Sequence, residues 1–389
     1  MKLDIAFTNK LETVSSDKLS LCYQCGTCTA ICPAGVPVRT LLRGAQLGAG
    51  ETVISDDRVW YCATCKLCEL GCPRGVKITD TIHALRVAAY ESKKVPKKLE
   101  TALWGVYEDA NPWSGKKPDR VKWAQGLTVK VGKPAKYLLY VGCAASFDPR
   151  LQRVARSLAS IMIKADVDFS ILGSAESCCG DVVYQMGEEG FLEELVHGNI
   201  QTFAKSGAEA IIAISPHCYN MFKSIYPKYD ESGRDGGGSM LPALHYTEFL
   251  AGLLEKGSLG MGRVDGDATV TYHDPCYLGR YHGIYEEPRK LLDSIPGVKI
   301  AEIDDNKANA LCCGGGGGRM WVESEDERPS MRRVKQAAET GASQMVTSCP
   351  YCIQNFEDSA RTAGISLGIM DVSEVIAHAL GIESEGGAT

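Results

Sequence analysis

The chain has 389 residues, of which 44% are hydrophobic and 23% are charged, and its formal net charge is -6. A length of this order predicts two or three domains rather than a single core, and the negative charge argues against a nucleic-acid-binding protein. No run of about 18 apolar residues is present, and residues 1–10 carry neither an apolar signal core nor a twin-arginine motif. We therefore expect a cytoplasmic protein that reaches a membrane only through a partner protein.

All 17 cysteines belong to two kinds of repeated pattern. Disulfide frameworks are typical of short secreted chains, so closely spaced cysteines in a long chain without a signal peptide indicate metal ligands. The first pattern lies in a predicted small cysteine domain at residues 16–92. It is a Cys-x2-Cys-x2-Cys-x3-Cys-Pro run that begins at Cys22 and again at Cys62.

This spacing is typical of bacterial two-cluster ferredoxins, in which three cysteines of a run hold one [4Fe–4S] cubane and the fourth holds the other. We therefore expect two cubane clusters in this domain. The predicted ligands are Cys22, Cys25, Cys28 and Cys72 for one cluster, and Cys62, Cys65, Cys68 and Cys32 for the other. Two structural zinc sites are the alternative, but zinc would leave the third cysteine and the trailing Cys-Pro of each run without a purpose.

Apolar residues recur at three- and four-residue steps from Ile78 to Ala88, which predicts a helix after the second run. Residues 93–136 are rich in Lys, Trp and Pro. Since proline interrupts regular structure, this segment is predicted to be an irregular connector on the surface.

From about residue 137 onward the chain contains an internal repeat. Cys143 and Cys276 are 133 residues apart, and four further pairs of positions are each 134 residues apart. These pairs are Cys178 and Cys312, Cys179 and Cys313, Ser215 and Cys349, and Cys218 and Cys352. The repeat predicts two cysteine-rich α/β lobes, at residues 137–262 and 266–383.

The apolar patterns between these cysteines repeat as well. The first copy predicts strands at 137–141, 167–172 and 210–214, and helices at 150–164, 191–203 and 245–255. The second copy predicts strands at 268–272, 298–303 and 344–347, and helices at 286–294, 330–339 and 372–380. Alternating strands and helices indicate a small parallel sheet in each lobe. The predicted fold class is a multi-domain α+β protein, in which a helical two-cluster domain precedes two lobes related by a pseudo-two-fold axis, with their cysteine loops facing one cleft.

Cys312 and Cys313 are adjacent, and adjacent side chains on an extended backbone point to opposite sides. We expect them to bind two separate irons of an open cluster rather than one iron of a cubane. Five glycines, Gly314–Gly318, follow at once and leave room for the backbone to approach a bulky core and donate N–H groups. A phosphate-binding loop is the alternative, but no Gly-Lys-Ser/Thr sequence follows and no dinucleotide spacing fits.

The order Cys…Cys-Cys-Gly…Cys-Pro-x-Cys, complete in the second copy, resembles the cysteine-rich domain of heterodisulfide reductases. Residues 58–65 (Arg-Val-Trp-Tyr-Cys-Ala-Thr-Cys) and 72–80 (Cys-Pro-Arg-Gly-Val-Lys-Ile-Thr-Asp) resemble the small ferredoxin-type subunit of the same enzymes. Over roughly residues 16–380 the chain is therefore similar to the D-type subunits of heterodisulfide reductases, in which a C-type ferredoxin module and a B-type cysteine-rich module are fused. The iron–sulfur subunits of glycolate oxidase and of anaerobic glycerol-3-phosphate dehydrogenase share this layout.

The resemblance implies that a complete motif binds a non-cubane [4Fe–4S] cluster through five cysteines, and that a substrate disulfide is cleaved between two such clusters. The implied catalytic site of this chain is the complete second motif, formed by Cys276, Cys312, Cys313, Cys349 and Cys352.

The first copy departs from this pattern. It matches at Cys143, Cys178, Cys179 and Cys218, but Ser215 stands at the fifth position. Because a serine hydroxyl is far less acidic than a thiol, we expect a four-cysteine iron–sulfur cluster or zinc in this lobe. His217 is an alternative ligand beside Cys218, although the second copy has Tyr351 at that place.

Cleavage of a disulfide requires two electrons and two protons. His273, Arg280 and His282 flank Cys276 and are candidate proton donors, with strand packing or a surface position as the alternative for each. No flavin or nicotinamide motif is visible, so the electrons are expected from another protein.

The leading hypothesis is an iron–sulfur oxidoreductase subunit of an anaerobic complex, which passes electrons through two cubanes to the second-lobe site. Its stronger form adds the reduction of a small thiol or disulfide substrate. The alternative is a pure electron conduit between redox partners, such as a quinone-linked cytochrome b, a flavoprotein, a hydrogenase-type protein or an acyl-CoA reductase. A scaffold with purely structural clusters is a third hypothesis.

Overall fold

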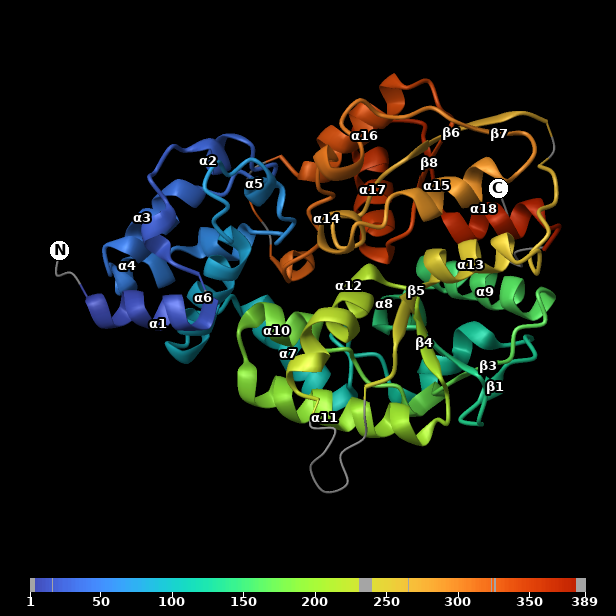
Figure 1. Ribbon diagram of the computed structural model, residues 1–389, viewed down its shortest axis with the longest axis horizontal. Coiled ribbons are helices and arrows are strands. Elements are labelled where there is room, and N and C mark those ends of the chain that lie inside the picture. The colour runs from blue at the N-terminus through green and yellow to red at the C-terminus, as the bar shows by residue number, and fades with distance from the viewer. Residues whose placement is uncertain are drawn as a thin grey trace.

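The computed structural model describes residues 4–15, 17–230, 240–264, 266–322, 324 and 327–382. A helical unit forms the amino-terminal end of the molecule, and two lobes with parallel sheets follow it (Figure 1). The predicted domain bounds at residues 16 and 383 lie outside the described residues. No helix in the described ranges is long and apolar enough to cross a membrane.

The helical unit is built around two copies of the cysteine loop. In each copy the backbone is left-handed at two matched places, with φ of 67° at Gln24 and 49° at Thr64, and of 87° at Gly26 and 62° at Lys66. A left-handed residue other than glycine costs about 1–2 kcal/mol, and such strain is typical of loops that wrap a ligand. The helices of this unit are α1 (Ile5–Ser15), α2 (Thr27–Ala30), α3 (Val38–Gln46), α4 (Gly50–Ile54), α5 (Leu67–Leu70) and α6 (Ile78–Glu91).

The helix predicted after the second cysteine run is confirmed as α6. Its apolar face buries Ile82 and Leu85, which have 0% of their surface exposed. Arg86 on the same helix is also fully buried, and its guanidinium donates hydrogen bonds to the carbonyl oxygens of Val59, Cys62, Gln185 and Gly317. Arg86 therefore ties the second cysteine loop to both lobes.

The prediction of an irregular connector at residues 93–136 is wrong over part of its length. The helix α7 (Lys97–Asp109) lies within it and buries Leu99, Ala102 and Val106, and a 3-10 stretch covers Lys117–Ala124. The prolines that suggested a loop flank α7 instead of interrupting it. The apolar spacing within α7 is the signal that outweighs them.

The first lobe contains five strands in the order β1-β3-β2-β4-β5, and every neighbouring pair is parallel. Three strands are confirmed as predicted, whereas β1 (Lys130–Val131) and β5 (Ala243–His245) were not predicted. The confirmed strands are β2 (Tyr137–Tyr140), β3 (Phe169–Ile171) and β4 (Ala210–Ala213). The helices are α8 (Cys143–Phe147), α9 (Pro149–Lys164), α10 (Asp181–Met186), α11 (Glu189–Lys205), α12 (Pro216–Asn220) and α13 (Tyr246–Glu255).

The second lobe contains four parallel strands in the order β7-β6-β8-β9, which is the order of β3-β2-β4-β5 in the first lobe. The predicted strands are confirmed, and β9 (Gly368–Asp371) is an additional one. The other strands are β6 (Ala268–Tyr272), β7 (Val298–Ile300) and β8 (Gln344–Thr347). The helices are α14 (Gly279–His282), α15 (Glu286–Asp293), α16 (Pro329–Glu339), α17 (Pro350–Ala363) and α18 (Val372–Ala379).

The two lobes meet through four helices that lie side by side in Figure 1. Helix α9 of the first lobe packs against α18 of the second, and α13 of the first packs against α15 of the second. The Tyr246 hydroxyl donates a 2.7 Å hydrogen bond to Asp371 across this contact. This packing joins the two lobes, so that both sheets and their cysteine-bearing ends belong to one packed structure.

Candidate metal centres

The first group of amino-terminal sulfurs lies near the surface. Burial raises the pKa of the Cys28 thiol, and the negative charges of Cys22 and Cys25 add to the rise. Partial desolvation raises the pKa of Tyr23, as do the charges of Cys25 and Cys72. Cys25 is exposed, and 61% of the Tyr23 surface is exposed beside it. The four cysteines predicted for one cubane therefore lie around an accessible loop.

The second group is buried. Burial, together with the charges of Cys32 and Cys65, raises the pKa of the Cys62 thiol to about 12, although Arg86 opposes the rise. Burial also raises the pKa of Cys68, with contributions from Cys62, Cys65 and Cys32. Cys32 of the first run thus lies with the first three cysteines of the second run.

The five cysteines of the second lobe form a continuous set of sulfur contacts. Cys312 is hydrogen-bonded to Cys276 and Cys313, and Cys352 is hydrogen-bonded to Cys313 and Cys349. The Sγ atoms of Cys352 and Cys313 are 3.2 Å apart. The structure therefore brings together all five residues that the sequence analysis assigned to this lobe.

The sheet explains how these residues meet. Cys276 follows β6, and Cys349 follows β8, its neighbour in the sheet, as the N-cap of α17. Loops at the carboxyl ends of adjacent parallel strands converge on one edge, which is where open α/β sheets bind ligands. A pocket of about 330 Å³ opens beside Cys313 and is lined by Gly314, Gln354 and Asn355 among others.

The second-lobe sulfurs also touch the helical unit. The side chains of Cys65 and Cys312 are in hydrogen-bonding contact, and both are buried. Ala63, Cys65 and Leu67 pack with Cys276, Tyr277 and Cys312 in one apolar cluster. The second amino-terminal group and the second-lobe group are therefore in direct contact.

The glycine run, which was expected to approach a cluster, also contacts the backbone of the second cysteine loop. A Cβ atom at Gly316 would lie 2.5 Å from the carbonyl oxygen of Ala63, and one at Gly317 would lie 2.3 Å from that of Cys62. Of the five glycines in the run, only Gly314 and Gly315 have N–H groups that donate to cysteine sulfurs, at 3.2 and 3.4 Å. Two of the glycines thus admit the backbone of the second cysteine loop.

The four cysteines of the first lobe form a similar line. Cys143 is hydrogen-bonded to Cys178, Cys178 to Cys179, and Cys179 to Cys218. Ser215 lies in the wall of the same cavity, but its hydroxyl accepts a 3.3 Å hydrogen bond from the backbone N–H of His217 as the N-cap of α12. This cavity has room for about one water molecule, with a volume of about 20 Å³.

A buried ion pair that the sequence analysis missed supports the first lobe. Arg120, from the connector, donates to Glu176 at 3.0 Å and lies 3.5 Å from the Cys143 sulfur. The Glu176 carboxylate also accepts from the backbone N–H groups of Val141 and Gly142. The pair therefore fixes the loop that carries Cys143, and sequence spacing offers no signal for a partner 56 residues away.

His217 does not join the sulfurs of its own lobe. Its Nδ1 is 3.1 Å from Asp181 Oδ2, and its ring is hydrogen-bonded to Cys349 of the second lobe. Burial would lower the pKa of His217, but Asp181 and Cys349 together raise it to about 10. Burial likewise opposes ionisation of Cys349, yet hydrogen bonds from Cys352 and His217 lower its pKa to about 6.

The three candidate proton donors have different surroundings. His273 is buried, its Nδ1 accepts from Arg333, and burial holds its pKa well below the usual range. Arg280 lies beside Cys65, Cys276 and Cys312, whose charges raise its pKa despite burial, and a guanidinium holds its proton at ordinary pH. His282 is 3.1 Å from Asn220 of the first lobe. His273 and Arg280 thus lie near second-lobe sulfurs, whose charges act on them, whereas His282 contacts the first lobe.

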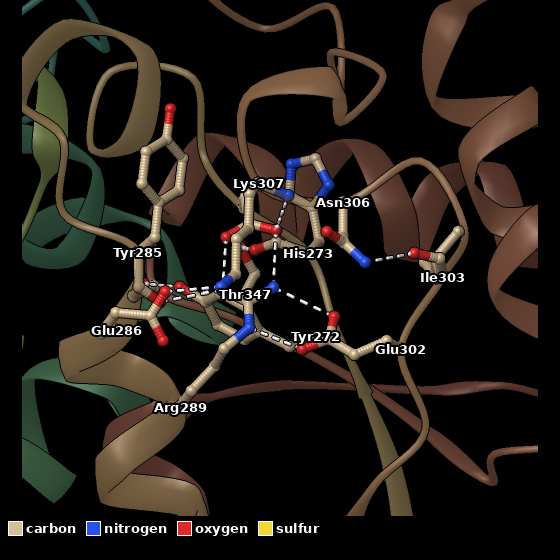
Figure 2. A network of polar contacts seen from close by, with 12 residues as sticks. Tyr272, His273, Tyr285, Glu286, Arg289, Glu302, Ile303, Asn306, Lys307 and Thr347 are labelled. Atoms are coloured by element: carbon tan, nitrogen blue, oxygen red, sulfur yellow. Dashed lines mark hydrogen bonds and ion pairs between the residues drawn. The ribbon is translucent and has the colours of Figure 1, made fainter.

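A polar network holds the loop that leads to Cys276. Arg289 donates to both carboxylate oxygens of Asp274 and of Glu302, and the Lys307 N–H donates to Asp274 at 2.8 Å. Figure 2 shows Arg289, Glu302 and Lys307 grouped beside His273. Asp274 lies two residues before Cys276, so this network is the second-lobe counterpart of the Arg120–Glu176 pair.

The donor sets fit iron–sulfur clusters. Cysteine binds metal as the thiolate, and burial raises the pKa of most of these thiols, so a positively charged core is needed to hold them ionised together. In the parts of the chain that the structure describes, no group of three or more His, Cys, Asp or Glu side chains is arranged to hold a single metal ion.

Comparison with known proteins agrees with this arrangement. Residues 21–77 match the 4Fe-4S dicluster domain, and residues 137–223 and 270–357 each match the Cysteine-rich domain. The chain is 35% identical to the probable iron-sulfur-binding oxidoreductase FadF of Bacillus subtilis over 300 residues, which cover 74% of this chain and 41% of the relative. It is 34% identical over 304 residues to the EtfAB:quinone oxidoreductase of Syntrophomonas wolfei, with 74% of this chain and 41% of that protein covered.

A third relative matches over more of its own length. It is the D-type subunit of the dihydromethanophenazine:CoB–CoM heterodisulfide reductase of Methanosarcina mazei, which is 32% identical over 289 residues, with 73% of this chain and 68% of the relative covered. The chain spans only 41% of each of the first two relatives, whose other segments have no counterpart in the match. The chain belongs to the family of iron–sulfur oxidoreductases that includes the D-type subunits of heterodisulfide reductases.

Proposed function

We propose that the chain is an electron-transfer subunit of a larger redox complex, in which the exposed amino-terminal cysteines accept electrons and the second lobe delivers them. The contact between Cys65 and Cys312 carries this proposal. Iron–sulfur clusters supply one-electron transfer when bound. The order of the sites follows from the exposure of Cys25, the burial of Cys65 and the position of the pocket beside Cys313.

The proposed ligands of the two cubanes are Cys22, Cys25, Cys28 and Cys72, and Cys62, Cys65, Cys68 and Cys32. The proposed ligands of a non-cubane cluster in the second lobe are Cys276, Cys312, Cys313, Cys349 and Cys352. Cys143, Cys178, Cys179 and Cys218 are the proposed ligands of a further iron–sulfur cluster in the first lobe. The clustering of these sulfurs within each group supports the assignment.

We also propose that the two lobes are related by a pseudo-two-fold axis. Their sheets have the same strand order, and their contacts are reciprocal. Helices α9 and α15 hold equivalent places in the two lobes, as do α13 and α18. Because α9 packs on α18 and α15 packs on α13, each lobe presents the same pair of helices to the other.

The stronger form of the proposal is the reduction of a small disulfide or related thiol compound at the second lobe. The pocket beside Cys313 supports it, since about 330 Å³ lies in the range of small-molecule sites. The relatives named for heterodisulfide reduction and for quinone reduction suggest two acceptors, a disulfide and a quinone-linked partner. Ser215 favours chemistry at one lobe over cleavage shared equally between two.

The test is electron paramagnetic resonance of the anaerobically reduced protein, together with iron and zinc counting. We expect two cubane signals and an additional centre that responds to an added thiol or disulfide. Two cubane signals without any further centre would rule out the catalytic form and the delivery role of the second lobe. An additional centre that ignores thiols and disulfides would leave the conduit as the function.

A further inference from the structure

Three positions at which the lobes differ lie together in space. Asp181, Ser215 and His217 of the first lobe correspond, at an offset of 134 residues, to Gly315, Cys349 and Tyr351 of the second. Asp181 is 3.1 Å from the His217 ring, and Ser215 accepts from the His217 N–H at 3.3 Å. The first lobe therefore differs from the second at its fifth ligand position and at two residues that contact each other beside it.

His217 carries this group of residues into contact with the second lobe. The ring of His217 stacks on Tyr277 with centroids 4.1 Å apart and lies 4.6 Å from the ring of Tyr351, so second-lobe aromatic rings hold it in place. The same ring is in hydrogen-bonding contact with Cys349, the cysteine that matches Ser215. Only 4% of the His217 surface is exposed, and water does not compete for this contact.

The direction of the hydrogen bond follows from the available donors. A carboxylate such as Asp181 only accepts, so the facing Nδ1 of His217 carries hydrogen. A cysteine that binds metal is a thiolate and also only accepts, so the opposite ring nitrogen donates to Cys349. Asp181 in turn accepts a 3.4 Å hydrogen bond from Gln185, which also donates to the Tyr277 hydroxyl at 2.9 Å. The donor is thus fixed in orientation by a chain of buried contacts.

We propose that His217, held by Asp181, is a positioning residue that donates a hydrogen bond from the first lobe to Cys349 and so raises the reduction potential of the second-lobe centre. The inference rests on the proposed function, because it requires a cluster held by Cys349. One-electron reduction adds one negative charge to such a centre and its sulfurs, and breaks no bond. A donor aimed at a ligand sulfur stabilises that added charge, which is a recognised lever on cluster potential.

The experiment is a redox titration of the fully assembled chain, followed by electron paramagnetic resonance at each potential. His217→Phe keeps an aromatic ring between Tyr277 and Tyr351 but removes the donor, and we expect the midpoint of the second-lobe centre to move to lower potential. Asp181→Asn keeps the histidine but weakens the hydrogen bond that orients its ring, so we expect a smaller shift of the midpoint in the same direction. Both cubane midpoints should stay unchanged.

His282→Phe is the matched control, since this histidine contacts Asn220 and we assign it no sulfur contact. An unchanged second-lobe midpoint in His217→Phe, or an equal shift in His282→Phe, overturns the inference. If His217→Phe does not assemble the centre, Asp181→Asn decides, and an unchanged midpoint or loss of the centre there also overturns it. Absence of any second-lobe centre in the parent protein overturns both this inference and the proposed function, whereas an unshifted midpoint overturns this inference alone.

Discussion

The two lobes have the same strand order and the same placement of cysteines at the sheet edge, yet they offer very different surroundings to a ligand. The second lobe has five cysteines, a neighbouring pocket of about 330 Å³ and direct contact with the helical unit through Cys65. The first has four cysteines and a cavity of about 20 Å³ closed by Trp113 and Tyr351. After duplication of a site, one copy can thus become the working centre while the other supports it.

The two lobes also use different residues to hold the loop that carries the first cysteine. In each lobe a buried ion pair holds the loop before the first cysteine, which runs from β2 to Cys143 in the first lobe and from β6 to Cys276 in the second. The first lobe uses Arg120 from the connector with Glu176, and the second uses Arg289 of α15 with Asp274 and Glu302. Both loops are held by a buried arginine, but the arginine comes from a different segment of the chain in each lobe.

The largest contrast is expected from Cys312→Ala and Cys178→Ala, which are equivalent positions. Cys312→Ala should abolish the additional second-lobe centre and lower the iron content, because Cys312 joins Cys276 to Cys313. Cys178→Ala should leave that centre in place. Electron paramagnetic resonance with iron analysis measures both. Loss of both cubane signals in Cys312→Ala would contradict the division into separate sites.

The next largest effect is expected from breaking the two ion pairs. Arg120→Met leaves Glu176 buried without its partner and should destabilise the fold by about 3–5 kcal/mol. Arg289→Met should cost a similar amount, because it leaves Asp274, whose side chain is 2% exposed, buried without its partner. Glu302 adds little to this cost, since its side chain is 37% exposed and water can solvate it. Denaturant unfolding of the two variants measures both losses. A loss below about 1 kcal/mol in either variant, the range of a surface ion pair, would contradict the role of its ion pair.

A smaller contrast concerns the capping residues of equivalent helices, His245 at α13 and Asp371 at α18. Burial lowers the pKa of His245 to about 3, so the unfolded chain takes up a proton first as pH falls below about 6.5, and stability is lost between there and about 3. Burial raises the pKa of Asp371 to about 7, so the folded chain holds its proton longer, and stability is lost as pH rises from about 4 to 7.

The two caps should therefore respond to pH in opposite directions, each by about 1 kcal/mol per pH unit within its window. In the parent protein the two slopes largely cancel between about pH 4 and 6.5, where the windows overlap. His245→Asn should therefore leave a stability that falls as pH rises from about 4 to 7, and Asp371→Asn should leave one that rises with pH up to about 6.5. Thermal unfolding of the two variants from pH 4 to 8 tests this. A common change of slope in both variants would mean that neither cap determines the profile.

The smallest effect is expected from Ser215→Cys, which restores the fifth cysteine of the first lobe. The side chain lies in the wall of the cavity formed with Cys143, Cys178, Cys179 and Cys218. We expect an additional paramagnetic signal at less than one spin per chain, since the cavity has a volume of only about 20 Å³ and Asp181 and His217 still line it. Ser215→Ala is the control and should add no signal.

Local patterns in the sequence predicted the repeated parts of the fold well. The apolar spacing in α6 and the short apolar runs of β2, β4 and β6 are properties of neighbouring residues, so a single sequence reveals them. Helix α7 was missed although Leu99, Ala102 and Val106 have helical spacing, because the prolines around it were given more weight. The short edge strand β5 pairs with a single strand, β4, and its three residues leave little local trace in the sequence.

The individual cysteine groups were predictable from spacing, whereas their relations to one another were not. The contact of Cys65 with Cys312 joins residues 247 positions apart and depends on how the glycine run meets the Cys62–Ala63 backbone. The hydrogen bond of His217 to Cys349 likewise crosses from one lobe to the other. Such contacts follow from packing between domains, and no periodic pattern in the sequence encodes them.

The close approach at Gly316 and Gly317 also constrains how the protein can change over time. Any larger residue at these two places would push the second cysteine loop away from the second lobe and lengthen the path that an electron must tunnel. Each module could keep its fold and its metal after such a substitution, while electron transfer between the modules slowed. These glycines therefore permit the close approach of the two modules, and we expect their replacement to slow electron transfer between them.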